Sequence, residues 1–277
     1  MNDLDGSVRE AIEGGLLGER LWLYSNYHCN LACAYCLTES APAVPRRRLP
    51  AEAMKAAAVE GEELGFGGIG ITGGEPFLRR DLPGLAAELS ELLPVLVLTN
   101  GTLFAGNRID RLDPLRDRDV TLQISLDAAT PIVNDPMRGP GNFERVVAAI
   151  PRLLERGIGV RVATTIYGQD EDELDTLRDL VGYLGVRPDD HVVRPTAARG
   201  RAVQAGLGEQ AGVEELPAEV TVTVDGLFWS PFAPTVRGGR LDTDLLVSRQ
   251  TAPLSAGVRK MLGLLGRAPT AEAARFK

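Results

Sequence analysis

All three cysteines of the chain lie within nine residues, in the stretch HCNLACAYC at residues 28–36. Three residues separate Cys29 from Cys33, and two separate Cys33 from Cys36. Cysteine thiolates bind zinc or iron–sulfur clusters. An odd number of cysteines packed this closely favours a metal site over a disulfide framework.

Two metal sites fit this spacing. A structural zinc site requires four ligands, and His28 is a poor fourth because neighbouring residues rarely chelate one ion. His191 could reach from another segment, so zinc stays open as an alternative. A [4Fe–4S] cluster held by three cysteines leaves its fourth iron without a protein ligand. The cysteine motif therefore suggests a cluster that binds a small molecule.

Strand-like and helix-like segments alternate through the first 195 residues. Short apolar strands alternating with helices predict an α/β fold with a buried parallel sheet. Six such units predict a partial (β/α)6 TIM-like barrel with function at the carboxyl ends of its strands, where the cysteines follow the first strand. We expect strands at 21–27, 67–72, 95–100, 120–127, 159–167 and 191–195, and helices at 50–65, 82–93, 107–117, 143–157 and 170–185.

The pattern changes after Pro195. Residues 219–234 alternate valines around Asp225-Gly226, which predicts a β-hairpin, and residues 254–266 predict a helix. We therefore divide the chain into an N-terminal segment (1–18), the partial barrel (19–202) and a C-terminal extension (203–277). We expect the extension to close the open side of the barrel without binding a metal.

The stretch CNLACAYC, with Tyr35 before its last cysteine, resembles the signature of the radical S-adenosylmethionine (radical SAM) enzymes. The resemblance implies a [4Fe–4S] cluster on Cys29, Cys33 and Cys36, whose open iron chelates the amino and carboxylate groups of SAM. One electron then splits SAM, and the resulting 5′-deoxyadenosyl radical abstracts hydrogen from a substrate. Tyr35 belongs to the cofactor-binding set by the same resemblance.

Further motifs follow the next three strands. In TGGEP (72–76), glycines permit close approach to a ligand, and Glu75 brings negative charge near an ammonium. In ISLDA (124–128), the family places the serine near SAM and polar neighbours near the ribose. A structural Gly-Gly turn and helix capping by Asp127 are the alternatives. The resemblance makes cofactor-binding candidates of Gly73, Gly74, Glu75, Pro76, Thr99, Asn100, Ser125 and Asp127.

Three arginines complete the candidate set. MRGPGNFERVVAAI (137–150) resembles a subgroup that includes molybdenum-cofactor and peptide-maturing enzymes, in which Arg138 would meet a carboxylate. Arg161 and Arg194, on the fifth and sixth expected strands, could point into the barrel and contact SAM or an anionic substrate. A buried charge there would need a partner.

The extension departs from the subgroup. Many members carry further cysteines there and bind auxiliary clusters, whereas this chain has Ser230 and Pro231 at the expected place and no later cysteine. We therefore expect no auxiliary cluster and no cysteine hydrogen donor. Trp229 and Phe232 are expected to be core residues or a pocket wall.

The composition of the chain limits the kinds of partner that it is expected to bind. A net charge of −8 argues against nucleic acid or an anionic membrane surface. The acidic N-terminus is no signal peptide, and no stretch approaches the ~20 apolar residues of a membrane span. We therefore expect a cytoplasmic protein without a nucleic-acid or membrane partner.

The combined prediction is a radical SAM enzyme that takes electrons from a reductant such as flavodoxin or ferredoxin. Residues 1–18 leave no room for a peptide-recognition domain, which favours a small-molecule substrate in natural-product or cofactor biosynthesis. The alternatives are a ribosomal-peptide maturase working with a partner protein and, in another class, a non-catalytic iron–sulfur sensor or binding module.

Overall fold

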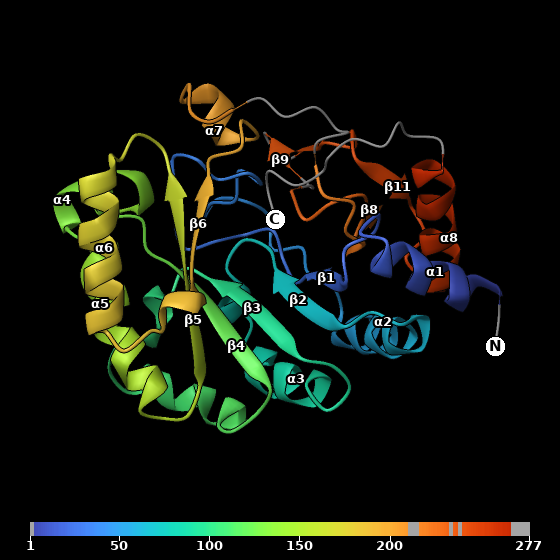
Figure 1. Ribbon diagram of the computed structural model, residues 1–277, viewed down its shortest axis with the longest axis horizontal. Coiled ribbons are helices and arrows are strands. Elements are labelled where there is room, and N and C mark those ends of the chain that lie inside the picture. Colours follow the sequence, from blue (N-terminus) through green and yellow to red (C-terminus); the bar gives the residue numbers. More distant parts are fainter. Residues whose placement is uncertain (1–2, 210–215, 233–234, 238–239, 267–277) are drawn as a thin grey trace.

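The computed structural model describes residues 3–209, 216–232, 235–237 and 240–266 (Figure 1). Its core is a parallel sheet of β1 (Arg20–Tyr24), β2 (Gly68–Thr72), β3 (Val95–Thr99), β4 (Val120–Ser125), β5 (Gly159–Ile166) and β6 (His191–Pro195). The main connecting helices are α2 (Ala51–Leu64), α3 (Leu82–Leu89), α5 (Asn142–Leu154) and α6 (Glu171–Tyr183). This confirms the predicted α/β partial barrel, whose sheet is not closed.

Strand alternation separates the two faces of the sheet. Leu21 and Leu23 of β1 are fully buried in the main core between the sheet and its helices. Arg20, Trp22 and Tyr24, at the intervening positions, line an inner cavity, as a side-chain period of two requires. A Cβ on Gly70 would lie 2.3 Å from Cε3 of Trp22, so this glycine makes room for the indole.

The cysteine loop follows β1 and packs against the loop after β2. The amide of Gly74 donates to the carbonyl of Asn26 at 2.8 Å, and the amide of Glu75 donates to the carbonyl of His28 at 3.1 Å. A Cβ on Gly74 would lie only 2.1 Å from the carbonyl oxygen of His28, and one on Gly73 2.4 Å from that of Asn26. The Gly-Gly pair therefore allows these two loops to meet backbone to backbone.

Residues from much later in the chain hold the other side of the cysteine loop. The side chain of Arg201 donates from Nε to the carbonyl of Cys33 at 2.8 Å, and its amide donates to the carbonyl of Cys36 at 3.0 Å. Thr235 Oγ1 donates to the carbonyl of Leu37 at 2.9 Å. The loop is therefore fixed by both the barrel and the extension.

The extension lengthens the sheet at its β1 edge. Strand β7 (Thr221–Thr223) pairs with β1 in parallel, β8 (Gly226–Phe228) forms the predicted hairpin with β7, and β11 (Leu246–Ser248) pairs with β8. The order is β11-β8-β7-β1-β2-β3-β4-β5-β6, so no described strand joins β11 to β6. The expected closure is thus not made by strand pairing. β9 (Val236–Arg237) and β10 (Arg240–Leu241) form a separate pair.

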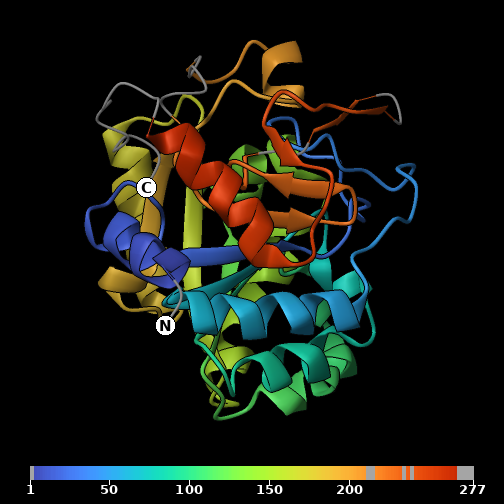
Figure 2. The same cartoon turned by 90° about the vertical axis from the view of Figure 1, so that its right-hand side faces the viewer.

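Several elements differ from the sequence-based expectations. The N-terminal segment contains an unexpected helix α1 (Asp3–Glu13), which packs with α2 against α8 (Leu254–Leu265) (Figure 2). The expected helix at 107–117 is a 3-10 helix (Gly106–Leu115), whose Pro114 removes a backbone donor. Residues 210–215 of the C-terminal extension lie outside the described residues.

Short segments complete the chain. They are α4 (Pro131–Arg138), α7 (Arg201–Gln204) and the 3-10 turns Pro76–Leu78, Thr102–Phe104 and Pro188–Asp190. Within the described part of the chain, no helix has the length and apolar character needed to cross a membrane.

The contact between the two loops predicts a large effect of substitution at Gly74. Gly74→Ala would force a methyl group against a carbonyl that cannot rotate away, so we expect about 1–3 kcal/mol of destabilisation. Gly84→Ala is the matched control, because nothing lies within 4 Å of its added Cβ and the residue is within helix α3. Urea unfolding of both variants measures the difference, and equal stability of the two would contradict this packing.

Candidate active site

The three cysteine side chains lie in the loop after β1. Cys29 is buried, and Cys33 and Cys36 are partly exposed. The amide of Leu31 donates to Sγ of Cys29 at 3.4 Å, and Nδ2 of Asn100 donates to the same sulfur at 3.6 Å. Such donors stabilise negative charge on sulfur and tune iron–sulfur clusters.

Burial also affects the thiols directly. It raises the pKa of Cys29 to about 12 and raises the pKa of Cys33, because both lose the water that would solvate a thiolate. A bound cationic metal centre would offset this cost. Three soft thiol donors on one loop, one of them approached by two N–H groups, therefore fit an iron–sulfur cluster.

The zinc alternative would need His191 as a fourth ligand beside the three cysteines. Nε2 of His191 lies 2.8 Å from Oγ1 of Thr164, on neighbouring strands β6 and β5. Among the residues described, no three His, Cys, Asp or Glu side chains converge closely enough to hold one metal ion. A cubane cluster differs, because its ligands bind separate irons and lie farther apart than the ligands of a single ion.

Glu75 is fully buried and ties the second loop to the end of β3. Its carboxylate accepts from the amides of Phe77 and Asn100 at 3.0 and 2.8 Å and from Oγ1 of Thr99 at 2.8 Å. Burial raises its pKa, and these hydrogen bonds oppose the rise. The structure thus brings Glu75, Thr99 and Asn100 together, with Pro76 opening the following 3-10 turn.

Asp127 occupies a second buried centre. Oδ2 accepts from the hydroxyl of Tyr35 and, at 3.2 Å, from Nη1 of Arg138, which also donates to Tyr35. Oδ1 accepts from the amide of Thr165 at 3.0 Å. The carboxylate therefore joins the cysteine loop, the ends of β4 and β5, and α4, so these three candidate residues are positioned by one another.

The inner cavity has a volume of about 650 Å³ and lies on the concave side of the sheet. At the end nearest the cysteine loop it is lined by Tyr35, Cys36, Gly73 and Ser125. Arg161 and Arg194 line it as well. The remaining candidates, including Gly74, Glu75, Asp127 and the other two cysteines, are not part of its lining.

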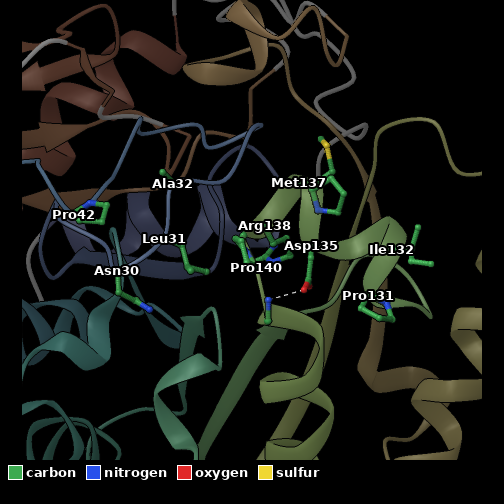
Figure 3. Close-up of a pocket in the computed structure, with 13 residues that line it drawn as sticks. Asn30, Leu31, Ala32, Pro42, Pro131, Ile132, Asp135, Met137, Arg138 and Pro140 are labelled. Atoms are coloured by element: carbon green, nitrogen blue, oxygen red, sulfur yellow. Dashed lines mark hydrogen bonds between the residues drawn. The ribbon is translucent and has the colours of Figure 1, made fainter.

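A second cavity of about 790 Å³ lies outside the cysteine loop, between that loop and α4 with its following turn (Figure 3). Leu31 and Ala32 line one side, and Ile132 and Met137 line the other. Arg138 lines this cavity rather than the inner one. Arg138 therefore lies in a different cavity from Arg161 and Arg194.

Several residues that line the inner cavity are not among the candidates suggested by the sequence. Arg20, Trp22, Gln123 and Pro217 line it. Phe232, which the sequence suggested as a core residue or pocket wall, also lines it. The alternation of Arg20, Trp22 and Tyr24 along β1 was the available signal. No local pattern indicated that Pro217 would reach the same space.

Comparison with known proteins identifies the family. The family model of the Radical SAM superfamily matches residues 23–183. Mycofactocin maturase MftC of Mycobacterium tuberculosis is 34% identical over 183 residues, which cover 65% of this chain and 46% of MftC. Pre-heme d1 synthase of Dinoroseobacter shibae is 37% identical over 164 residues, covering 57% of this chain and 39% of that enzyme. The chain thus spans less than half the length of these relatives.

Solved structures agree on the fold. Streptococcus suis SuiB bound to the precursor peptide SuiA superimposes with a TM-score of 0.57 at 19% identity, covering 70% of this chain and 43% of SuiB. The superfamily uses a [4Fe–4S] cluster and SAM, which is the cofactor pair that the cysteine motif implies. The family match spans more than half of the chain, its relatives are enzymes, and the thiols fit the cluster. The chain therefore belongs to the radical SAM superfamily of enzymes.

Proposed function

We propose that this radical SAM enzyme acts on a small molecule in natural-product or cofactor biosynthesis. The observation that carries the proposal is the inner cavity of about 650 Å³ beside the cysteine loop. Small-molecule sites in proteins typically measure roughly 300–1,000 Å³. The cavity extends from Cys36 and Ser125 toward Arg20 at the start of β1, so cofactor and substrate would share one space.

The chain's own residues have separate tasks in this proposal. Cys29, Cys33 and Cys36 would hold the cluster, and Ser125 and Gly73 would border SAM. When bound, the cluster supplies the electron for reductive cleavage of SAM, which initiates hydrogen abstraction. A cytoplasmic electron donor such as flavodoxin or ferredoxin would supply that electron.

A ribosomal-peptide substrate is the second candidate. Its support is the similarity to mycofactocin maturase MftC and the fold shared with SuiB, which is solved with a precursor peptide. A partner protein would then deliver the peptide. The two candidates differ in what couples SAM cleavage to product formation.

Turnover assays separate the two candidates. Reconstituted, reduced protein is incubated with SAM and either small molecules or precursor peptides encoded near its gene. Formation of 5′-deoxyadenosine in step with a modified small molecule supports the first candidate. Product formation only with a peptide, or only with an added peptide-binding partner, would replace it with the second.

The cluster assignment predicts iron loading that depends on the cysteines alone. We expect about four irons per chain and a brown chromophore after anaerobic reconstitution. Cys33→Ser should lose both, because a ligand is missing. His191→Ala should keep both, since that side chain contacts Thr164. Iron and zinc analysis of the purified proteins measures this, and a colourless protein with one tightly bound zinc would refute the assignment.

The cavity lining predicts a role for Ser125 in binding SAM. Ser125→Ala should weaken SAM binding by about 0.5–1.5 kcal/mol, the net contribution of one hydrogen bond. Thr121→Ala, on the same strand but absent from the cavity lining, should leave SAM binding unchanged. Equilibrium binding of SAM to the loaded protein tests the pair. Equal affinity in both variants would remove Ser125 from the site.

A further inference from the structure

Three arginines line the inner cavity, one from β1 and two from the neighbouring strands β5 and β6. Arg20 begins β1, Arg161 lies on β5 and Arg194 lies on β6, and all three line the cavity. Strands β2, β3 and β4 separate β1 from β5. Burial lowers the pKa of Arg161 and Arg194, and the charge of Arg20 lowers both further. The curved sheet thus brings these cations within electrostatic reach across the cavity.

The guanidinium groups of these three arginines lack some of their hydrogen-bond and ion-pair partners. Nε of each is buried without a hydrogen-bond partner. None of the three forms a salt bridge with a described carboxylate. The three side chains are half-buried, and removing a charge even partly from water without a partner costs free energy. These side chains are therefore arranged as a site that an added anion would stabilise.

Nearby acidic groups reduce the positive charge of this cluster, but none of those that the structure describes forms a salt bridge with the three arginines. Glu19 and Glu219 line the same cavity. Glu219 accepts a hydrogen bond from Nε1 of Trp22 at 2.9 Å, and its charge raises the pKa of Arg194. Asp190 acts in the same direction on Arg161. Glu19 and Glu219 thus share the cavity wall with the three guanidinium groups, and Asp190 acts on Arg161 from outside that wall.

The position of Arg20 argues against a contact with the carboxylate of SAM. Arg20 and Tyr24 are the first and last residues of β1, and the cysteine loop follows Tyr24. A rise of about 3.3 Å per residue places the two ends of this strand roughly 13 Å apart. The carboxylate is the only anionic group of SAM, and the family places it at the cluster.

We propose that Arg20, Arg161 and Arg194 bind an anionic group of the substrate, a carboxylate or a phosphate. Arginine suits both, because its planar guanidinium donates paired hydrogen bonds to either group. Gln123 lies beside Arg161 in the strand register. Its buried Oε1 has no hydrogen-bond partner, so it could accept a hydrogen bond from a donor group of the ligand next to the anion. That the ligand is the substrate rests on the proposed function, whereas the anion site itself does not.

Anion binding can be measured without turnover. The reconstituted protein is titrated with inorganic phosphate or glutarate, with sodium chloride at equal ionic strength as reference, and its thermal midpoint is recorded. The variants are Arg161→Gln and Arg194→Gln. Arg118→Gln is the control, because Arg118 is a surface residue that pairs with Glu91. Iron content and circular dichroism of each variant confirm that it is folded.

The expected result is a saturable rise in midpoint for the wild type and Arg118→Gln. The two cavity variants should need on the order of tenfold more anion for the same rise. Without anion they should be at least as stable as the wild type, since repulsion among the cations is relieved. A response to glutarate alone identifies a carboxylate site, and one to phosphate alone identifies a phosphate site.

Two results would overturn the anion site. One is a midpoint that shows no saturable rise, or the same rise in all four proteins. The other is destabilisation of both cavity variants without anion, which would show that the arginines already have protein partners. A protein that binds anions but never cleaves SAM would defeat only the proposed function. A protein that cleaves SAM and turns over a small molecule but binds no anion would defeat only the anion site.

Discussion

The contact between the cysteine loop and the loop after β2 is the constraint on which the site depends. The two backbones approach so closely at His28 and Gly74 that a single methyl group would not fit between them. This approach lets Glu75 accept a hydrogen bond from the backbone amide of Asn100. The side-chain amide of Asn100 in turn donates to Sγ of Cys29. One steric requirement therefore sets the relative positions of the first three strand ends.

Buried carboxylates complete this framework. Glu75 and Asp127 both lie at strand ends and accept backbone N–H groups from neighbouring strands. A charge buried in this way is stable only when its acceptors are satisfied. The same charges that suggest contact with a cofactor thus also fix the loops that surround it, and Arg138 is held by Asp127 on the outer side of the cysteine loop.

The sequence predicts the local elements well because each βα unit carries its own pattern. Expected strand 120–127 and helix 143–157 match β4 (Val120–Ser125) and α5 (Asn142–Leu154) within a few residues. It predicts non-local pairing poorly. The partnership of Trp22 with Thr221 joins residues from opposite parts of the chain, and no local signal encodes it. Arg161 was a candidate because it lies within the expected strand 159–167. Arg20 was not, because it precedes the expected strand 21–27, although it begins β1 and lines the same cavity.

The support that Arg201 and Thr235 give to the cysteine loop has a consequence during synthesis. The thiols leave the ribosome early, but the last of these backbone partners follows about 200 residues later. At about 5–20 residues per second, the loop waits roughly 10–40 s for its second wall. Over that interval the cysteines are exposed on an incomplete scaffold. We therefore expect the cysteine loop to hold a metal centre firmly only after the segments that carry Arg201 and Thr235 have been synthesised.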